Sequence, residues 1–551
     1  MRAWCGVVLL LALGYPIAAQ EPAARHAAVD AVFARHVSAD GPGCAVAVVR
    51  RAQLVYARGY GLADVEHGTP FTPQTVFGIG SIYKQLVAAA ILLLERQGKL
   101  SLEDDIRKFV PEIPDYGARI TVRQLLDHTH GLRESSNLAA LTPVRSERPA
   151  DVLRLLSRQR GPAAAPGARV VYGNTGPLLA RLIVTRVSGQ PLGDFMRQQV
   201  FGPLGMRSTY VGDDSRAVPL RAMGYRRGPD GALIAVPSGG RNESTVEDLA
   251  RWGRNLERPA RGWKRLLRRM RTPQALRNGE VPDYGLGLRL SPYRGLERVW
   301  HPGLASGGVA ILMHFPEPRL TIAIGCNNQT LEPILLAESV ADVLLRDELA
   351  RAEPQSMVTL PDEALARLAG TYVSDTGSVL RIASRNGRLY AKSEGGSRRL
   401  EGESETGEHE LVPVSPTRFV FPGRPKLPLD PASEAVFEIP RDGGRTMVEV
   451  RTDWFPLRFT AVEPAGPSAT VPRAALGAYR NVETESTVTI LEREGRMELK
   501  TPHEQLEIVP VSRNLFRAGR FLLRFSPATG EQVLALDLTV GAVPNLRFDR
   551  Q

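Results

Sequence analysis

The spacing of apolar and polar residues separates the chain into two stretches of different character. Before residue 350 the apolar runs are long. Residues 85–94 and 175–183 have the spacing of buried helices, and residues 308–315 and 320–325 predict a β-hairpin of two apolar strands. After residue 361 the apolar runs are short and alternate with polar residues between Gly, Pro and Asp, which is typical of small antiparallel strands. The pattern therefore predicts an α+β domain followed by an all-β region.

An internal repeat of about 100 residues fills the all-β region. Residues 368–372 resemble residues 476–479, and residues 411–415 resemble residues 508–512. Each copy has the turn composition of a small antiparallel barrel, so the repeat predicts two barrels in series. The predicted boundaries are a first barrel over residues 362–464, a second barrel over residues 470–551, and a linker over residues 351–361 that follows a helix over residues 332–349.

The N-terminal residues have the pattern of a signal peptide. Arg2 precedes the apolar run 7–13, and small residues at 17–19 suit a cleavage site near Ala19. We interpret residues 1–19 as a signal peptide and expect a periplasmic or secreted protein. No later apolar run approaches the roughly 18 residues that a membrane-spanning helix needs, so we expect no membrane span in the mature chain.

A serine and a lysine stand one helical turn apart at the start of the first long helix. Ser81 and Lys84 occupy positions i and i+3, so the hydroxyl and the amine share one helix face, and Ser-x-x-Lys is a serine acylation site in outline. Residues 78–80, Gly-Ile-Gly, suit a tight turn that presents the serine at a helix N-terminus. The motif alone is a weak signal, because a serine in this place is equally well explained as a helix cap.

Two later segments contain polar residues that suit the same chemistry. Tyr172 and Asn174 lie on the loop that enters the second long helix, and His301 and Gly303 open the strand before the predicted hairpin. Each pair is common by itself. Their order and spacing after Ser81 make them informative.

The order and spacing of the three motifs resemble the serine β-lactamase and penicillin-binding-protein superfamily, specifically its class C-like branch. The resemblance covers roughly residues 28–350, which we interpret as one β-lactamase-like serine hydrolase domain. It implies an antiparallel sheet flanked by helices plus an all-helical lobe, and the two barrels make the whole architecture similar to the D-aminopeptidases of this superfamily. Further stretches with the same likeness are residues 54–64, 120–132, 239–250 and 284–288.

The resemblance implies an acyl-enzyme mechanism. Ser81 would attack a carbonyl, and Lys84 and Tyr172 would move the proton, either of them acting as the base. An ordinary tyrosine with a pKa of about 10 is a poor base at neutral pH, so Tyr172 needs a cationic Lys84 nearby, or Lys84 must lose its own proton through burial. Asn174 would hold the lysine and the substrate carbonyl. The backbone N–H groups of Ser81 and of Leu304, the residue after the motif glycine, would form the oxyanion hole.

The third motif departs from the form usual in penicillin-recognising enzymes. His301, Pro302 and Gly303 replace Lys-Thr-Gly or Lys-Ser-Gly, so a neutral imidazole replaces a cation and a hydroxyl donor is lost. Both lost groups recognise a substrate carboxylate, so we expect an ester, a D-amino-acid amide or a peptide with a different anchor. The alternatives are a β-lactamase or peptidoglycan DD-carboxypeptidase, and a non-catalytic cell-wall-binding protein on the same scaffold.

The role of the two barrels stays open at this level. In D-aminopeptidases the barrels help shape the pocket and recognise a free amino terminus, which would replace the missing carboxylate anchor. The copies here carry no diagnostic residues that match. Binding of cell-wall glycan and simple capping of the catalytic domain are equally compatible with their sequence.

Two cysteines remain after removal of the signal peptide. Cys44 begins the apolar strand over residues 44–49, and Cys326 follows the strand over residues 320–325. The resembled fold makes these strands antiparallel neighbours, which could bring the two sulfurs close, and an oxidising compartment permits a bridge. Because cross-strand disulfide geometry is restrictive, we expect two buried thiols and keep the disulfide as the alternative.

Charge and histidine content add little further chemistry. The net charge is +11, from 70 basic and 59 acidic residues that are mostly interspersed. In the densest basic cluster, residues 251–271, we expect a solvated helical face, with contact to an anionic envelope surface as the alternative. No nucleic-acid-binding motif is present. His128 and His130 lack a third ligand nearby, so we expect no metal and no other cofactor. A small-molecule or peptide substrate is the expected partner, and the oligomeric state cannot be read from the sequence.

Overall fold

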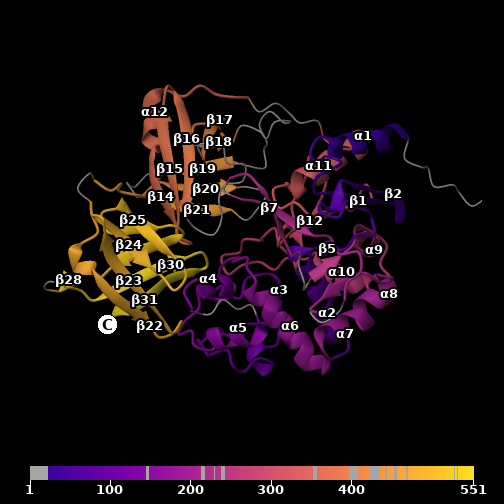
Figure 1. Cartoon of the computed structure of the whole chain (residues 1–551), viewed down its shortest axis with the longest axis horizontal. Coiled ribbons are helices and arrows are strands. Elements are labelled where there is room, and N and C mark those ends of the chain that lie inside the picture. Colours follow the sequence, from indigo (N-terminus) through magenta and orange to yellow (C-terminus); the bar gives the residue numbers. More distant parts are fainter. Residues whose placement is uncertain are drawn as a thin grey trace, which may run out of the picture. The chain divides into compact units, whose positions relative to one another are not determined.

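The computed structural model of the chain describes residues 23–143, 148–212, 217–228, 230–237, 242–350, 356–395, 407–421, 434–440, 444–451, 456–466, 469–526, 528–529 and 532–551. These residues form two compact units, each assembled from separate stretches of the chain (Figure 1). The first unit comprises Met1–Leu93, Gln190–Thr272 and Asp283–Ala350, and the second comprises Leu94–Gly189, Pro273–Pro282 and Arg351–Gln551. The predicted signal peptide, residues 1–19, lies outside the described residues.

The first unit is built on a six-stranded antiparallel sheet with the strand order β10-β11-β12-β13-β1-β2. The predicted hairpin is confirmed, because β12 pairs with β13 from Val309 to Phe315. Three of the strands, β1, β12 and β13, are buried on both faces, which explains why their sequences read as apolar runs rather than as alternating ones. The strands are β1 (Cys44–Arg50), β2 (Gln53–Tyr60), β10 (Arg289–Leu290), β11 (Val299–Ala305), β12 (Gly308–Phe315) and β13 (Leu320–Cys326).

Helices cover both faces of this sheet. The helices α1 (Ala23–Ala34) and α11 (Pro333–Leu344) pack on the face that carries Trp300, where they share one apolar core with the strands. The helix α9 (Val246–Glu257) packs against β1 and β13. Its approach is so close that a Cβ on Gly253 would lie 2.3 Å from a side-chain methyl group of β13. A larger residue at position 253 would therefore push this helix off the sheet.

The helix α11 is shorter than the sequence predicts. It ends at Leu344 instead of residue 349. The chain then turns, and the carboxylates of Asp347 and Glu348 pair with Arg25 at 3.0 Å and with Arg50 at 2.5 Å. These ion pairs connect the turn to α1 and to the end of β1, where the sequence predicts a further turn of helix.

The segment that carries Ser81 passes from a short strand into a buried helix. The strand β5 (Phe77–Gly78) leads into a 3₁₀ turn over Gly80–Ile82, and α2 (Tyr83–Arg96) follows. Gly80 has a φ of +46°, in the left-handed region that favours glycine, and it gives the chain the sharp turn before the helix. The apolar residues that predicted this helix are buried, so the prediction is confirmed.

The two cysteines of the described residues form a disulfide. Cys44 and Cys326 are directly opposite each other in the register of β1 and β13, with 4.0 Å between their Cα atoms, and both are buried. The expectation of two free buried thiols is therefore wrong, and the alternative holds. The reason is the register, which places the two side chains opposite each other with no offset.

Short helices form the helical part of the second unit, and α6 matches the second long helix predicted from the sequence. Thr121 starts α3 with a reciprocal capping box, because its side chain accepts from the backbone of Gln124 while the Gln124 side chain accepts from the Thr121 N–H. Gly189 ends α6 in the left-handed conformation, with a φ of +70°. The helices are α3 (Val122–Leu126), α4 (Ser135–Ala139), α5 (Pro149–Leu156) and α6 (Thr175–Ser188).

Two closed antiparallel barrels complete the second unit, as the repeat predicts (Figure 1). Tyr372 in the first barrel and Tyr479 in the second are both buried, and each donates its O–H at 2.7 Å to the carbonyl four residues upstream, so the repeat is present in side-chain geometry as well. The first barrel contains β14 (Gly370–Ser374), β15 (Ser378–Arg385), β16 (Arg388–Gly395), β17 (Glu408–Pro413), β18 (Arg418–Val420), β19 (Glu434–Glu438), β20 (Met447–Arg451) and β21 (Leu457–Val462). The second contains β22 (Gly477–Asn481), β23 (Ser486–Arg493), β24 (Arg496–Lys500), β25 (Gln505–Ser512), β26 (Leu515–Ala518), β27 (Phe521–Phe525), β30 (Ala535–Val540) and β31 (Val543–Arg550).

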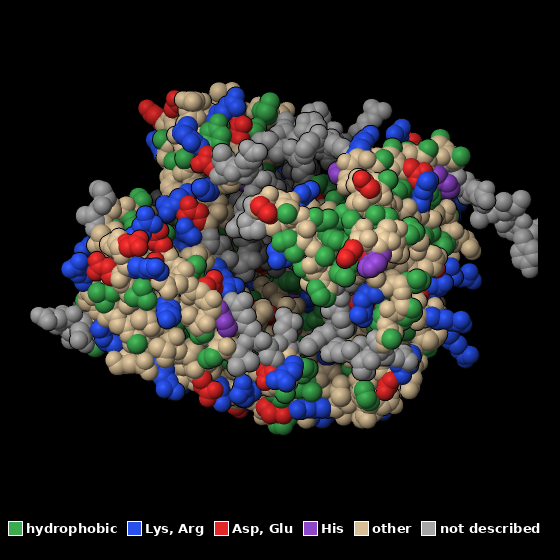
Figure 2. All heavy atoms as spheres, viewed as in Figure 1, with side chains coloured by type: hydrophobic (Ala, Val, Ile, Leu, Met, Phe, Trp, Pro, Cys, Tyr) green, Lys and Arg blue, Asp and Glu red, His purple; other side chains and the backbone are tan. Residues whose placement is uncertain are grey.

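Surface charge is distributed as the sequence suggests. Figure 2 shows basic and acidic side chains interspersed over the visible face. In the basic segment, Trp252, Trp263 and Leu266 are buried under α9 and α10 (Lys264–Met270), while Lys264 and Arg265 are exposed. This arrangement fits a solvated helical face, and contact with an anionic surface stays the untested alternative. Among the described residues, no helix combines the length and apolar character needed to cross a bilayer.

Candidate active site

Ser81 and Lys84 are joined by a short hydrogen bond. Lys84 Nζ donates to Ser81 Oγ over 2.6 Å, and the lysine is buried at the start of α2, with 3% of its surface exposed. Because the two residues lie one turn apart, the contact depends mainly on local backbone conformation. The serine hydroxyl is thus bonded to the lysine instead of to a backbone N–H at the helix start, which argues against the simple helix-cap interpretation.

The strand β11 runs directly beside the Ser81 turn. A Cβ on Gly303 would lie 2.0 Å from the carbonyl oxygen of Ile79, and a Cβ on Gly80 would lie 2.4 Å from the backbone nitrogen of Leu304. Only glycine at both positions allows this approach. It brings the Leu304 N–H next to the Ser81 turn, an arrangement that suits an oxyanion hole built from the N–H groups of Ser81 and Leu304.

The outer edge of β11 has no paired strand along the third motif. The strand β10 pairs only with Val299 and Trp300, so residues 301–305 have no strand partner on that side in the part of the chain that the structure describes. An open strand edge can offer main-chain groups to an extended substrate. Leu304 is 62% exposed, whereas residues 301–303 are buried. Pro302, which lacks an N–H, suits an edge position.

His301 is buried and uncharged. Its Nδ1 lies 2.6 Å from the carbonyl oxygen of Pro302, which can only accept, so Nδ1 carries the proton and Nε2 accepts the O–H of Tyr284 at 3.0 Å. Burial, helped by the nearby charge of Lys84, lowers the pKa of His301 to about 3. The imidazole is therefore neutral at pH 7, in agreement with the expectation for this motif.

In the second unit, a buried carboxylate holds the loop that carries Tyr172 and Asn174. Glu134 Oε2 accepts the backbone N–H of Asn174 at 2.9 Å and that of Thr175 at 3.0 Å, and Glu134 is 6% exposed. A Cβ on Gly173 would lie 2.1 Å from the same oxygen, so the loop presses directly on the carboxylate. The loop is thereby fixed at its end, while Asn174 itself is exposed.

The two neighbouring histidines His128 and His130 accept main-chain N–H groups near this loop. The ring of His128 lies 4.6 Å from that of Tyr172, and its Nδ1 accepts the N–H of Gly173 at 3.4 Å. His130 Nδ1 accepts the N–H of Leu132 at 2.9 Å, and burial lowers the pKa of this histidine to about 4. Both imidazoles thus serve as acceptors for main-chain groups of this region.

The predicted site residues fall into two groups, one in each unit. The first unit places the strand β11 with its histidine beside the serine–lysine pair, and the second unit carries the tyrosine and the asparagine on one loop. The first group is Ser81, Lys84, His301, Gly303 and Leu304, and the second is Tyr172 and Asn174.

Sequence reasoning misses the supporting role of three residues. Tyr284, which holds His301, and His128 lie in the stretches 284–288 and 120–132 that already resemble the superfamily, so a signal was available for both. Glu134 acts on Asn174, 40 positions away in the chain, and nothing in the local pattern relates it to that loop. Contacts of this length are visible only in the fold.

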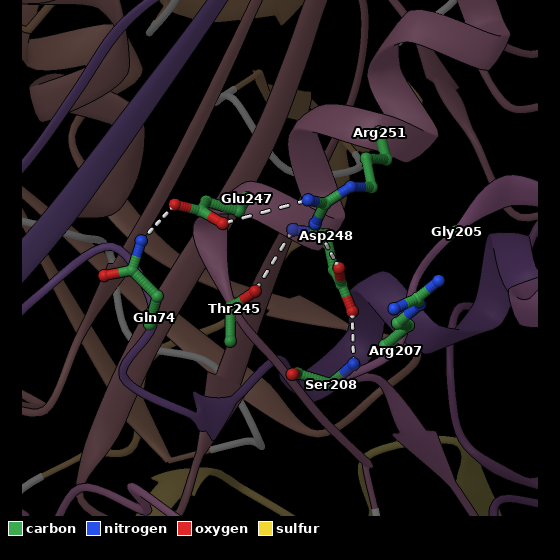
Figure 3. A pocket seen from close by; sticks show the side chains of 8 residues that line it. All are labelled: Gln74, Gly205, Arg207, Ser208, Thr245, Glu247, Asp248 and Arg251. Atoms are coloured by element: carbon green, nitrogen blue, oxygen red, sulfur yellow. Dashed lines mark hydrogen bonds and ion pairs between the residues drawn. The ribbon is translucent and has the colours of Figure 1, made fainter.

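A polar cavity of about 380 Å³ opens in the first unit at the start of α9 (Figure 3). Its carboxylates already have partners: Asp248 accepts from the backbone of Ser208 at 2.7 Å and pairs with Arg251 at 2.6 Å, and Glu247 contacts Gln74. None of the residues that line this cavity is a predicted site residue. The cavity therefore belongs to the scaffold around α9.

Comparison with known sequences gives one family and several relatives. A profile of the family described as Beta-lactamase matches residues 29–347, more than half of the chain. A D-aminopeptidase of Cereibacter sphaeroides (strain KD131 / KCTC 12085) is 24% identical over 529 residues, which cover 92% of this chain and 94% of that protein. A D-aminopeptidase of Gluconobacter oxydans (strain 621H) is 26% identical, with 78% and 79% covered. A penicillin-binding protein of Bacillus subtilis (strain 168) is 27% identical, with 66% and 85% covered.

Solved structures give the same fold. The octameric penicillin-binding protein homologue from Pyrococcus abyssi superposes with a TM-score of 0.52 at 23% identity, over 79% of this chain and 99% of that chain. The D-amino acid amidase from Ochrobactrum anthropi SV3, complexed with L-phenylalanine amide, superposes with a TM-score of 0.50 at 24% identity, over 58% of this chain and 97% of that chain. With the family match over residues 29–347, the chain belongs to the beta-lactamase family and is a serine hydrolase of the D-aminopeptidase and penicillin-binding-protein type.

Proposed function

We propose that the protein hydrolyses D-amino-acid amides or peptides with a D-amino-terminal residue, through an acyl-enzyme on Ser81. The observation that carries the proposal is the 2.6 Å hydrogen bond from Lys84 Nζ to Ser81 Oγ, next to the unpaired edge of β11. A nucleophile within hydrogen-bond reach of its activator, beside a pair of main-chain donors, is the arrangement that acyl transfer needs.

The reaction follows from the roles of these groups. Ser81 Oγ attacks the substrate carbonyl while its proton leaves, and the N–H groups of Ser81 and Leu304 stabilise the oxyanion. A protonated Lys84 has no lone pair, so in that state the proton goes to Tyr172, which must then be a phenolate; a neutral Lys84 can accept the proton directly. The same proton is given to the departing amine, and water then cleaves the ester to release the acid and restore Ser81. Asn174 is assigned to hold the lysine and the carbonyl, and this role, like that of Tyr172, rests on the motif.

The substrate class follows from the third motif and from the relatives. His301 is buried and neutral, so it brings no charge for the substrate carboxylate that a cationic Lys-Thr-Gly motif would recognise. One D-aminopeptidase relative matches 92% of this chain, so its match extends through the barrels as well as the catalytic domain. Both observations favour an amide without a carboxylate next to the scissile bond over a β-lactam.

Labelling and turnover test this proposal together. A fluorophosphonate probe should label the wild-type protein at one peptide that contains Ser81, and S81A should abolish the label. D-Alanine p-nitroanilide should be hydrolysed faster than the L-isomer, and a short nitrophenyl ester faster than a chromogenic cephalosporin. Turnover of the cephalosporin at a rate orders of magnitude above the amide and the ester would instead establish a β-lactamase. Labelling that persists in S81A would remove Ser81 as the nucleophile.

We further propose that the protein acts outside the cytoplasm. The N-terminal pattern of residues 1–19 supports export, and the disulfide between Cys44 and Cys326 suits an oxidising compartment. N-terminal sequencing of the protein from its native host should give a start near residue 20. An intact Met1 on the folded protein would contradict the proposal.

A further inference from the structure

The rim of the second barrel, defined here as the turns 482–485 and 541–542, contacts the helical part of its own unit. Glu483 on the first turn is 8% exposed, and its Oε2 accepts Arg133 Nη1 at 2.7 Å and the backbone N–H of Arg160 at 2.8 Å. Arg133 Nη1 also donates to Gln159 Oε1 at 2.9 Å. The pair is nearly buried on both sides, with 11% and 10% of the two side chains exposed, so loss of either charge leaves the other uncompensated.

The second turn of the rim makes two main-chain contacts to the same segment. The N–H of Ala542 donates to Asn137 Oδ1 at 3.2 Å, and the N–H of Glu134 donates to the Ala542 carbonyl at 3.4 Å. Gly541 has a φ of +51°, and a Cβ on it would lie 2.5 Å from Asn137 Oδ1. Glycine is therefore required here both by the backbone conformation and by the contact.

The segment held by the rim, residues 133–137, in turn holds the Tyr172 loop. The Glu134 carboxylate accepts the N–H groups of Asn174 and Thr175, the Arg133 carbonyl accepts the Thr175 hydroxyl at 3.1 Å, and the Ser135 N–H donates to that hydroxyl at 2.8 Å. Every link between the rim and the loop is thus a hydrogen bond between described residues of one unit.

We propose that Glu483 and Arg133 are positioning residues for the Tyr172–Asn174 loop, so that the second barrel sets the geometry of the proton-transfer step. The inference rests on the proposed function, which assigns Tyr172 and Asn174 to the reaction. Neutralising Glu483 leaves the Arg133 guanidinium buried beside Glu134, and the segment must shift to hydrate it. A displacement of about 1 Å at a reacting group is enough to cost up to about 100-fold in rate. A barrel that is only fastened to the domain would give no such effect on catalysis.

The test is a double-mutant cycle on the full-length protein. We expect Glu483→Gln to lower kcat/KM for D-alanine p-nitroanilide by about 10- to 100-fold, mostly through kcat. The rate of fluorophosphonate labelling, which stays measurable when turnover is slow, should fall in the same proportion. In a Tyr172→Phe background, adding Glu483→Gln should change the labelling rate by less than about twofold, because both changes affect one group. Glu485→Gln is the matched control on the same turn, because Glu485 is half exposed in its pair with Arg158 and should leave the rates within about twofold.

Contrary outcomes are distinct from one another. Full activity of folded Glu483→Gln, or losses that multiply in the double variant, would overturn the positioning role. If Glu483→Gln does not fold, Gly541→Ala tests the second contact of the rim. It should show the same loss of kcat and the same non-additivity with Tyr172→Phe. Full activity of a folded Gly541→Ala would then overturn the proposal. Failure of the proposed function has another signature, because Ser81→Ala would then keep its label and Tyr172→Phe its turnover.

Discussion

The two groups of predicted site residues are held in place by different kinds of contact. In the first unit, Ser81 and Lys84 are one turn apart, and β11 approaches them through main-chain contacts at Gly80 and Gly303. In the second unit, the Tyr172 loop has no strand partner within the described ranges, and it is held by a main-chain bond from the Val171 N–H to the His128 carbonyl at 2.8 Å and by the carboxylate of Glu134. The first arrangement follows mainly from backbone geometry, whereas the second depends also on a buried carboxylate.

The difference determines what each group tolerates. Main-chain contacts do not titrate and do not reorient, so the contacts at Gly80 and Gly303 should respond to volume and hardly to charge. A carboxylate that accepts two backbone N–H groups makes strong hydrogen bonds while it is charged and in place. Its removal leaves two buried donors without an acceptor. The second group should therefore respond to charge as well as to volume.

The largest expected effect tests whether the two groups serve one reaction. Tyr172→Phe removes only the phenolic oxygen, and loss of a proton-transfer group lowers kcat/KM by about 10²- to 10⁴-fold. The measurement is hydrolysis of D-alanine p-nitroanilide over a range of concentrations, with kcat falling and KM nearly constant. Tyr390→Phe, at a partly buried tyrosine of the same unit outside the motif, should leave kcat/KM unchanged. Equal activity of the two variants would separate the tyrosine loop from the chemistry.

The next effect compares the two units at acid pH. Burial lowers the pKa of His301 and of His314 in the first unit to about 3, so the unfolded chain binds two protons below pH 6.5 that the folded unit does not. Stability is complete above that pH and falls as the pH drops, by about 2 kcal/mol per histidine between pH 7 and pH 5. In the second unit, burial lowers the pKa of His130 as well, so this histidine also reduces stability as the pH drops. Burial raises the pKa of Asp127 to about 6. As the pH drops, Asp127 takes up its proton at a higher pH in the folded state than in the unfolded state. This uptake stabilises the folded state and offsets part of the stability lost at His130.

Hydrogen exchange followed by mass spectrometry measures the protection of each unit separately. Between pH 7 and pH 5, and after correction for the intrinsic exchange rate, protection should fall more in peptides of β12 and β13 than in peptides of α3 and α6. His314→Gln should remove about half of the acid sensitivity of the first unit. Equal losses in the two units would show that buried histidines do not distinguish them.

Sequence reasoning succeeds where the determinants are local. The helix after Ser81, the hairpin of β12 and β13 and the repeated barrels follow from periodicity and turn residues within short windows. The disulfide shows the limit, because the neighbouring strands can be expected while the register that faces Cys44 with Cys326 comes from pairing across the sheet. The contacts of Glu134 with Asn174 and of Arg133 with Glu483 span 40 and 350 positions, and no local pattern encodes them.

A matched pair of glycine substitutions distinguishes main-chain contact from side-chain contact. Gly303→Ala sets a Cβ 2.0 Å from the carbonyl oxygen of Ile79, which cannot rotate away, so we expect a loss of about 1–3 kcal/mol in the free energy of unfolding. Gly173→Ala sets a Cβ 2.1 Å from Glu134 Oε2, at the end of a side chain that can shift. Its cost in stability should be smaller, while kcat/KM falls because the loop loses its acceptor. Urea unfolding and turnover of both variants give the comparison, and the reverse ranking in stability would contradict it.

The smallest expected effect comes from the first barrel, whose ion pair reaches the same loop. Asp375 pairs with Arg169, three residues before Tyr172, but the two side chains are 57% and 36% exposed. An ion pair in this setting contributes about 0–1 kcal/mol, because water and salt screen it. Asp375→Asn should therefore leave kcat/KM within about twofold and the unfolding free energy within about 1 kcal/mol. If Asp375→Asn lowers kcat/KM as much as Glu483→Gln does, proximity to the loop matters more than burial. The distinction between buried and exposed ion pairs then fails for this unit.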